Sequence, residues 1–517
     1  MARGARLGIV TSALVHSLRT DLDSARFTVT TLTELWGVEA EEALHRNERV
    51  PALRALTVRR QAHGAEASAT LATLFVLGLA VTRDDLAAAL PTLGVDGAVE
   101  LGLVEVEGTE VRPLLDLRPY SFVDGAGAGS WWILSDLGEL ALGRPITEEH
   151  VLGVGGASVT LSGLMMQTPI GTVLDLGTGC GIQAMHAARH ATSVVATDIS
   201  ERALVLARLN AELNGIRNIE FRLGNLFEPV RGERFDQIVS NPPFVITPRA
   251  EGVPSYEYRD GGMEGDALVE AVLRGAAAHL NPGGIAQMLG NWEYRVGQDA
   301  FRRVGGWLDG TGLDAWIIER DVQDAPQYAE TWIRDGGTKP GTPDFDRLYA
   351  AWLDDFEARR VTQVGFGYVT LRMPLAGSPT LRRLERLHGS LGSNEAGLGL
   401  HLEAVLAAHD WQAEQSDAEL ASSHLTVAPD VTEERHYWPG AEHPTAMMLR
   451  QGGGFGRTIR MDTALSALVG ASDGDLSVGA VVAAIAQLLD VDYAELLAEL
   501  TPRLRDLLND GFLLPAE

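Results

Sequence analysis

Two short segments of this 517-residue chain carry residue types and spacings that could do chemistry. The first is an apolar run that ends near Asp175 and leads into a glycine-rich turn, Gly177-Thr178-Gly179-Cys180-Gly181. Glycines permit a tight turn and a close approach of backbone to a ligand, and a helix that begins after them presents free N–H groups. Asp198 ends the next apolar run, where a carboxylate can accept hydrogen bonds from ribose hydroxyls. This layout predicts a nucleotide-type site and leaves a methyl-donor cofactor and a nicotinamide dinucleotide both open.

The second segment is Asn241-Pro242-Pro243-Phe244, which follows the apolar run Gln237–Ser240. Two prolines stiffen the chain, so we expect the Asn241 side-chain oxygen and the Pro242 carbonyl to face outward as fixed acceptors. Together they can hold both hydrogens of an NH₂ group, while Phe244 offers a flat face for a planar substrate. Methyl transfer to such a nitrogen depends on positioning and charge complementarity, and no strong base is required before attack. The pair of segments therefore favours methyl transfer to a planar nitrogen, because a nicotinamide oxidoreductase predicts no Asn-Pro-Pro loop.

The elements that would position these segments extend from Pro169 to about Pro374. Strand-like runs are expected at Thr172–Leu176, Ser193–Thr197, Ile219–Leu223, Gln237–Ser240 and Gly284–Leu289, and helical patterns at Gln183–His190, Ala203–Asn214 and Asp266–Leu280. This alternation predicts an α/β fold with a doubly wound, Rossmann-like and mostly parallel sheet. Ala315–Arg320 and Gly365–Met373, without an obvious helix between them, are expected to form an antiparallel edge hairpin.

The flanking regions predict two α+β modules, which gives domains at 1–125, 126–375 and 376–517. Three helical patterns and a hairpin around Glu107-Gly108 indicate a winged-helix-like N-terminal domain. A glycine-rich connector, Asp124–Ser130, and a strand at Trp131–Leu134 lead into the central domain. In the C-terminal domain, helices are expected at Leu381–His388, Leu398–Asp410, Thr463–Val469, Val478–Leu489 and Tyr493–Asp510, with short strands at His424–Val427, Arg435–Trp438 and Ala446–Arg450.

Composition and charge exclude some classes of protein. The formal net charge of −28 opposes binding to phosphate backbones unless the cations cluster. Residues 1–60 hold 9 arginines against 7 acidic residues, whereas residues 381–517 hold 9 against 21, so any nucleic-acid contact is expected near the N-terminus. The single cysteine, Cys180, excludes an internal disulfide and a cysteine-cluster zinc site, and we expect no metal. Because no apolar stretch approaches a membrane span and no signal peptide is visible, a cytoplasmic location is expected.

The two motifs together resemble the class I S-adenosylmethionine-dependent methyltransferases of the Asn-Pro-Pro-Tyr/Phe type. Within that group the chain is most similar to release-factor glutamine methyltransferases and to ribosomal RNA guanine-N2 methyltransferases, over roughly residues 150–375. Gly224-Asn-Leu-Phe-Glu-Pro229, Arg259-Asp-Gly-Gly262 and Gly265-Asp266 add weaker matches.

The resemblance implies S-adenosylmethionine as cofactor and assigns roles to matching positions. The methionine part of the cofactor would lie against the strand end and the glycine turn, the ribose and adenine against the ends of the next two strands, and the substrate nitrogen against the proline loop. The residues in that order are Asp175, Gly177, Thr178, Gly179 and Gly181; Asp198, Ile199, Asn225 and Leu226; and Asn241, Pro242, Pro243 and Phe244. Asn225 replaces the usual Asp and keeps an acceptor oxygen without its charge.

The substrate stays open between a protein glutamine and an exocyclic amine of RNA, with DNA adenine third. Phe244, in place of Tyr, favours RNA, whereas the overall acidity and the Arg259–Gly262 segment favour glutamine. A different class of function is a non-catalytic, cofactor-binding regulatory or nucleic-acid-binding protein, although the intact Asn241–Phe244 loop argues against it. The partner expected is a macromolecular substrate, with no membrane contact, and the sequence does not give the oligomeric state.

Overall fold

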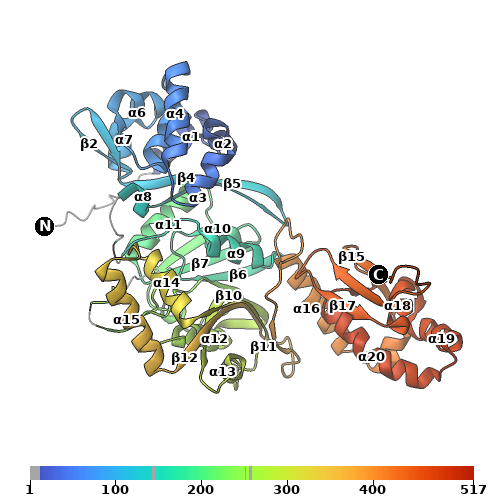
Figure 1. Ribbon diagram of the computed structural model, residues 1–517. Helices are drawn as coiled ribbons and strands as arrows, with labels where there is room; N and C mark the ends of the chain where they lie inside the picture. The colour runs from blue at the N-terminus through green and yellow to red at the C-terminus, as the bar shows by residue number, and fades with distance from the viewer. Residues whose placement is uncertain (1–11, 143–146, 148, 251, 255–258, 517) are drawn as a thin grey trace. The chain divides into compact units, whose positions relative to one another are not determined.

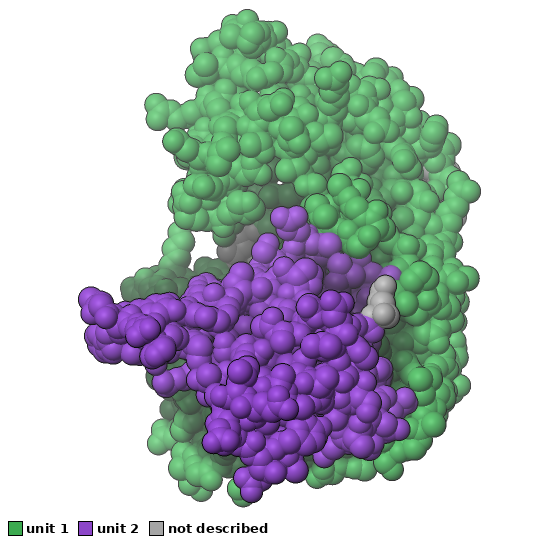
Figure 2. Space-filling model, turned by 90° about the vertical axis from the view of Figure 1, so that its right-hand side faces the viewer, with its two compact units in different colours: residues 1–162, 168–386 green, residues 163–167, 387–517 purple. Residues whose placement is uncertain are grey.

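A computed structural model describes residues 12–142, 147, 149–250, 252–254 and 259–516. The chain forms two compact units, which Figure 2 draws in separate colours. Unit 1 comprises residues 1–162 and 168–386, and unit 2 comprises residues 163–167 and 387–517. Unit 1 thus holds both the expected N-terminal and the expected central regions, and the three-domain division stays a prediction.

The centre of unit 1 is an eight-stranded sheet with the strand order β13-β11-β12-β10-β9-β6-β7-β8. Figure 1 labels strands β6, β7, β10, β11 and β12 of this sheet. Its strands are β6 (Ile170–Leu176), β7 (Ala191–Asp198), β8 (Ile219–Leu223), β9 (Phe235–Ser240), β10 (Leu280–Arg295), β11 (Asp314–Asp324), β12 (Val361–Arg372) and β13 (Arg382–Arg386). Strands β8, β7, β6, β9 and β10 run parallel, and β12 runs antiparallel to both β10 and β11. The predicted Rossmann-like, mostly parallel sheet is confirmed.

Strand order reverses at β6, and this reversal places the two sequence motifs together. After β6 the chain builds outward to β7 and β8, and it then crosses back to β9 on the other side of β6. The register pairs Leu176 of β6 with Thr197 of β7 and with Ser240 of β9, so the carboxyl ends of these strands meet at one edge. Ligands of open α/β sheets bind at such a switch point.

Helices cover both faces of the sheet. One apolar core lies beneath α12 (Ala267–His279) and α13 (Ala300–Trp307) and includes Leu174 and Met288. On the other face, α10 (Ile182–Ala187) and α11 (Glu201–Leu213) contribute buried side chains to a core that they share with the N-terminal region. A short helix, α9 (Gly156–Leu164), precedes β6, and a 3₁₀ turn, Glu228–Val230, follows β8.

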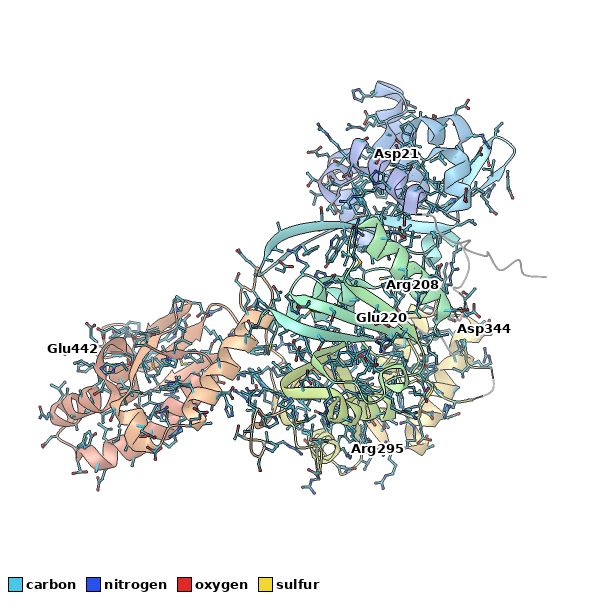
Figure 3. The ribbon with its side chains drawn as sticks, turned by 180° about the vertical axis from the view of Figure 1, so that it is seen from behind. Asp21, Arg208, Glu220, Arg295, Asp344 and Glu442 are labelled. Carbon is cyan, nitrogen blue, oxygen red and sulfur yellow. The ribbon has the colours of Figure 1, made fainter. Side chains whose placement is uncertain are left out.

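The N-terminal part of unit 1 contains the predicted winged-helix arrangement. Its leading helices are α1 (Ser12–Ser24), α2 (Val29–Trp36), α3 (Val38–His45) and α4 (Val50–His63). The winged-helix order then runs α5 (Ala67–Leu71), a π-helical turn (Ala72–Val76), β1 (Val81–Thr82), α6 (Arg83–Ala89), α7 (Gly94–Glu100), β2 (Val104–Glu107) and β3 (Glu110–Pro113), with a β1-β3-β2 sheet. The carboxylate of Asp21, labelled in Figure 3, is buried and accepts hydrogen bonds from the backbone N–H groups of Thr92 and Leu93, which ties α1 to the start of α7.

A long hairpin connects this region to the sheet domain. Strands β4 (Leu115–Asp124) and β5 (Gly127–Asp136) pair along their whole length, and α8 (Glu139–Leu142) follows. The glycine-rich stretch Asp124–Ser130, expected as a connector, is therefore the hairpin turn and the first part of β5. Small residues suit this position because the phenyl ring of Phe122 lies only 2.4 Å from where a Cβ of Gly129 would stand.

Unit 2 has its own apolar core and two small sheets. Its elements are α16 (Gly399–Ala413), α17 (Asp417–Ser422), β14 (His424–Val427), β15 (Val431–His436), β16 (Ala446–Gln451), β17 (Thr458–Met461), α18 (Thr463–Gly470), β18 (Asp473–Ser477), α19 (Val478–Leu489), α20 (Tyr493–Asn509) and β19 (Leu513–Pro515). The sheets have the orders β15-β16-β17 and β18-β14-β19. The series α18-β18-α19-α20-β19 follows a winged-helix order, and its central strand, β14, comes from earlier in the chain.

Two expectations are corrected. Residues 381–388, expected as a helix, contain strand β13, because their backbone pairs with the edge of β11 and Glu385 accepts a hydrogen bond from Trp316 Nε1 at 2.7 Å. The antiparallel pairing of β11 with β12 is confirmed, but two helices that the sequence analysis did not predict, α14 (Ala325–Asp335) and α15 (Pro343–Ala358), connect these strands.

Candidate active site

The glycine turn lies directly after β6, as its sequence predicts. The N–H groups of Gly177 and Thr178 both donate to the carbonyl of Thr197 on β7, each at 2.9 Å, and the N–H of Gly179 donates to Asp198 Oδ2 at 2.9 Å. All three glycines of the turn adopt positive φ, with 78° at Gly177, 56° at Gly179 and 90° at Gly181. Glycine is thus the residue that this backbone requires.

The three glycines differ in their surroundings. A Cβ on Gly177 or Gly179 would meet nothing within 4 Å, so the space beside them is open. A Cβ on Gly181 would lie 3.0 Å from the Cβ of Ala207 and 3.1 Å from its Cα. Gly181 therefore permits close packing of the turn on α11, while its predicted contact with a cofactor stays a prediction.

Asp175 is fully buried at the end of β6. Its Oδ2 accepts hydrogen bonds from Thr178 Oγ1 at 2.6 Å and from the N–H of Ala184 at 2.9 Å, which fixes the turn against the start of α10. Its Oδ1 is buried and accepts no hydrogen bond from any described residue. Burial, assisted by the nearby charge of Asp198, raises the pKa of the Asp175 carboxyl to about 7.

The ends of β7 and β8 supply the remaining predicted cofactor residues. The second oxygen of Asp198 accepts a hydrogen bond from the N–H of Ser200 at 2.8 Å, and burial raises the pKa of its carboxyl. Ile199 next to it has 62% of its surface exposed, which is unusual for an isoleucine at the end of a buried strand. Asn225 is exposed, and Leu226 adopts a left-handed φ of 45°, a strain that proteins concentrate at functional sites.

These residues fit an adenosyl cofactor with an amino-acid tail. The open space beside Gly177 and Gly179 leaves room for backbone approach, and the buried Oδ1 of Asp175 is an acceptor without a donor. Burial disfavours the ionised form of this carboxyl, and a cationic amino group beside it would stabilise that form and donate the missing hydrogen bond. The exposed Ile199 offers an apolar face for a flat base, beside the carboxylate of Asp198 for ribose hydroxyls.

The Asn241–Phe244 loop begins immediately after β9, one residue beyond the Ser240–Leu176 pair. Ser240 Oγ donates to the carbonyl of Leu176 at 2.8 Å, so the loop and the glycine turn leave the sheet side by side. Asn241 Oδ1 is buried and has no hydrogen-bond donor among the described residues. Pro242 is buried, while Pro243 and Phe244 are half-buried. The structure thus brings the two motifs together and leaves one acceptor of the predicted pair unused.

Phe244 is held within an aromatic cluster. Its ring meets those of Trp332 and Phe366 edge-on, at centroid distances of 6.5 Å in both cases. The Arg259–Gly262 segment packs beside it: residues 244 and 260 form an isolated antiparallel bridge, and a Cβ on Gly261 would lie 2.8 Å from the carbonyl oxygen of Pro243. This contact explains a glycine at position 261.

Three residues near the loop were not predicted from the sequence. Asn291 on β10 forms a hydrogen bond to the last residue of the motif, Tyr328 on α14 forms one to the chain just after it, and the Trp332 ring borders Phe244. A polar residue inside an apolar strand, as Asn291 is, and aromatic residues four apart, as in Tyr328 and Trp332, are the sequence signals that mark them.

Other candidate groups do not form sites. Burial raises the pKa of the Cys180 thiol to about 11, which opposes a nucleophilic role. Glu433 and Glu434 contact Arg435 and Arg450. In the described part of the chain, no three His, Cys, Asp or Glu side chains gather as metal ligands. The helices described there are all too short or too polar to cross a bilayer.

Comparison with known proteins agrees with this geometry. Residues 155–299 match the methyltransferase small domain family. Residues 24–114 and 403–515 each match a family described only as a domain of unknown function, DUF7059 and DUF7782 respectively.

Curated relatives share this central region. A release factor glutamine methyltransferase of Xylella fastidiosa is 41% identical over 130 residues, which are 23% of this chain and 47% of the relative. A ribosomal protein uL3 glutamine methyltransferase of Bradyrhizobium diazoefficiens is 35% identical over 170 residues, or 30% of this chain and 53% of that protein. The chain thus spans about half the length of these relatives.

A solved structure, a putative methyltransferase from Bacillus halodurans, covers 43% of this chain and all of that one at 17% identity, with a TM-score of 0.28. The family match and the relatives confirm the resemblance to class I methyltransferases that the two motifs predict. The roles of individual site residues stay predictions.

Proposed function

We propose that this protein transfers a methyl group from S-adenosylmethionine to the side-chain amide nitrogen of a glutamine in a protein substrate. The observation that carries the proposal is the buried oxygen of Asn241, which has no donor among the described residues. Asn241 begins the loop that leaves β9 next to the end of β6, where the glycine turn starts. An unused buried acceptor costs free energy, and the NH₂ of a bound primary amide would satisfy it.

The cofactor-binding residues in this proposal are those at the ends of β6, β7 and β8. Asp175 would accept from the amino group of the methionine part, Asp198 would accept from the ribose, and Ile199 would pack on the adenine. Gly177, Gly179, Asn225 and Leu226 would complete the wall of the site. When bound, S-adenosylmethionine supplies a methyl group activated by its sulfonium charge.

The residues of the chain then act by orientation. Asn241 Oδ1 and the carbonyl of Pro242 each accept one hydrogen of the substrate amide, which directs the nitrogen lone pair away from both oxygens. Phe244 borders the amide plane and limits its rotation. Such placement is worth several orders of magnitude in rate. As the nitrogen bonds to the methyl carbon, the carbon–sulfur bond breaks, and the nitrogen then loses one of its two hydrogens as a proton to water.

Two observations support glutamine over an RNA base. The curated relatives named above carry glutamine methyltransferase names. The net charge of −28 also disfavours a phosphate-rich substrate. RNA and DNA amines therefore become outcomes of the test.

The test combines radiolabelling with one matched pair of variants. Lysate of a strain that lacks the gene is incubated with the protein and tritiated S-adenosylmethionine, and the label is followed through RNase, DNase and protease. We expect protease alone to release the label, and hydrolysis of the labelled peptide to yield methylglutamine. Label released by a nuclease would overturn the glutamine proposal.

Asn241→Ala supplies the mechanistic arm. We expect kcat to fall about 10²- to 10³-fold, as for loss of one preorganised polar contact, while the affinity for S-adenosylhomocysteine in calorimetry changes less than twofold. Gln298→Ala, which removes an exposed amide from the same domain, is the control and keeps full activity. Transfer by Asn241→Ala at the wild-type rate would exclude the acceptor mechanism.

A further inference from the structure

Two buried side chains from distant parts of the sequence form hydrogen bonds to the backbone of residues 244–246, at the end of the Asn-Pro-Pro-Phe motif and just after it. Asn291 Nδ2 of β10 donates to the carbonyl oxygen of Phe244 at 2.7 Å. The Tyr328 hydroxyl of α14 accepts from the N–H of Ile246 at 2.9 Å, and it lies 3.3 Å from Asn291 Nδ2. Both residues are fully buried.

The opposite edge of the same segment is held by one backbone hydrogen bond and one hydrogen bond between side chains. The N–H of Val245 donates to the carbonyl of Arg259 at 2.9 Å, and Thr247 Oγ1 donates to the Asp260 carboxylate at 2.6 Å. In an extended chain, the backbone polar groups of consecutive residues point to opposite edges, so those of alternate residues share one edge. The backbone groups of Phe244 and Ile246 therefore share one edge, where the side chains of Asn291 and Tyr328 satisfy them. The N–H of Val245 faces the other edge, where the backbone of Arg259 satisfies it.

The hydroxyl of Tyr328 has little freedom to move. Its ring stacks on Phe366 of β12 at 5.6 Å with an interplanar angle of 21°, and it also contacts Trp352 and Phe356 of α15. Val245 and Ile246 belong to the same apolar core. The α14–α15 pair, inserted between β11 and β12, thus holds a hydroxyl at a fixed point against the loop.

We infer that Tyr328 and Asn291 are positioning residues for methyl transfer, which set the orientation of the Asn241–Pro242 acceptor pair through the backbone of residues 244–246. The inference rests on the proposed function and extends it to residues outside the motif. The two prolines between Asn241 and Phe244 make the connection stiff, so a shift at Phe244 or Ile246 is transmitted to the acceptors. A misplacement of about 1 Å at a reacting group can cost on the order of 10²-fold in rate.

The principal variant is Tyr328→Phe, which removes the hydroxyl and keeps the packed ring. We expect kcat to fall about tenfold, with the affinity for S-adenosylhomocysteine unchanged within twofold and the thermal midpoint nearly unchanged. Asn291→Ala should lower kcat in the same way. Tyr349→Phe is the matched control, because it removes a hydroxyl on α15 that lies 3.4 Å from the Glu330 carboxylate, and we expect it to keep the wild-type rate.

Hydrogen exchange of backbone amides, resolved to single residues by fragmentation, tests the hydrogen bond between Ile246 and Tyr328 without need of turnover. Tyr328→Phe should accelerate exchange of the Ile246 amide at least tenfold and leave the Val245 amide, bonded to Arg259, nearly unchanged. If the wild-type protein methylates nothing in lysate, the proposed function fails. The exchange experiment still decides whether Tyr328 holds the backbone at Ile246. Unchanged exchange at Ile246, or faster exchange with an unchanged kcat, would overturn the assignment of a positioning role.

Discussion

Asp175 combines a buried, partly unsatisfied carboxylate with a raised pKa. Because its pKa is about 7 in the folded chain, the carboxylate form is lost as the pH falls through 7. If this carboxylate binds the amino group of the cofactor, affinity for S-adenosylhomocysteine falls by up to about tenfold per pH unit below that pKa. Calorimetric titration at pH 8, 7 and 6 measures this slope. Asp175→Asn should bind weakly with a flat profile, and an unchanged slope in this variant would assign the titration elsewhere.

The raised pKa of Asp175 also affects folding stability, but in the opposite direction. We expect a rise in pH to strengthen cofactor binding and to weaken the fold. Raising the pKa of a carboxyl from its usual value near 3.8 to about 7 means that its ionised form is disfavoured in the fold. The Asp175 carboxyl therefore does not change the free energy of unfolding below pH 3.8. Between pH 3.8 and pH 7 it lowers this free energy progressively, by on the order of a few kcal/mol in total. Urea unfolding at pH 8 without ligand should show Asp175→Asn to be at least as stable as wild type.

Two glycines of the same turn have different surroundings: the space beside Gly179 is open, whereas Gly181 packs against helix α11. Alanine at Gly179 has no neighbour within 4 Å, so Gly179→Ala should weaken cofactor binding at a cost of only about 1 kcal/mol for the left-handed backbone. Alanine at Gly181 meets Ala207 at 3.0 Å, and Gly181→Ala should lower the free energy of unfolding by about 1–3 kcal/mol. Urea unfolding and calorimetry of both variants, side by side, measure the two effects. Equal loss of stability would contradict the open space at Gly179.

At the scale of elements, two side chains of helix α11 form hydrogen bonds to the backbone of strand β5. Asn210 Oδ1 accepts from the N–H of Leu134 on β5, and its Nδ2 donates to the carbonyls of Leu134 and Cys180, at 2.8–2.9 Å. Asn214 makes the equivalent pair with Trp132. One helix thereby joins the β4–β5 hairpin to the glycine turn, since Cys180 is part of that turn.

Asn210→Leu keeps the volume but leaves three buried backbone groups without partners. We expect a loss of about 3 kcal/mol or more, because each unsatisfied buried group costs about 1–3 kcal/mol. Glu212→Gln, on the exposed side of the same helix, should change stability by less than about 0.5 kcal/mol. The midpoints of urea unfolding report both values, and a mild effect of Asn210→Leu would mean that water reaches β5 at this point.

The sequence predicted those elements whose pattern is local. Strand Ile219–Leu223 and helix Val478–Leu489 have the predicted limits, and β6 reads as a continuous apolar run because both of its faces are buried. Strand β13 could not be predicted in this way. Its charged residues become strand through pairing with β11 and through the Arg383–Trp316 contact at 5.0 Å, which are tertiary effects.

The residues of the candidate site also divide into those that a local sequence pattern predicts and those that only tertiary contacts bring into place. The glycine turn and the Asn-Pro-Pro-Phe loop are contiguous in sequence, and their placement follows from the ends of β6 and β9. Asn291 and Tyr328 reach the loop from β10 and α14, which lie about 50 and 80 residues further along the chain. Only the folded chain brings these groups to Phe244 and Ile246, so the local patterns that mark Asn291 and Tyr328 do not show which segment these residues contact.

At the scale of the whole molecule, the division into two units crosses the chain in an unexpected place. Residues 163–167, which are separated from β6 by two residues, belong to unit 2. Leu164, Met165 and Met166 are buried there, and the first residue of α16, Gly399, approaches them closely. Unit 2 therefore includes a short segment from the central part of the sequence in addition to the C-terminal residues.

Gly399→Ala tests whether this strip of residues 163–167 is seated against α16 as the structure describes. A Cβ at position 399 would stand 2.1 Å from the carbonyl oxygen of Met165 and 3.1 Å from that of Leu164, both backbone atoms that cannot rotate away. Overpacking of this kind costs about 1–3 kcal/mol, so the full-length variant should unfold at lower urea and be cleaved faster by protease within residues 163–167. Gly470→Ala in α18 is the control, because a Cβ there meets nothing within 4 Å, and alanine favours helix by about 0.5–1 kcal/mol. If Gly399→Ala matches the wild type in both assays, the strip does not pack against α16, and residues 163–167 belong with β6 alone.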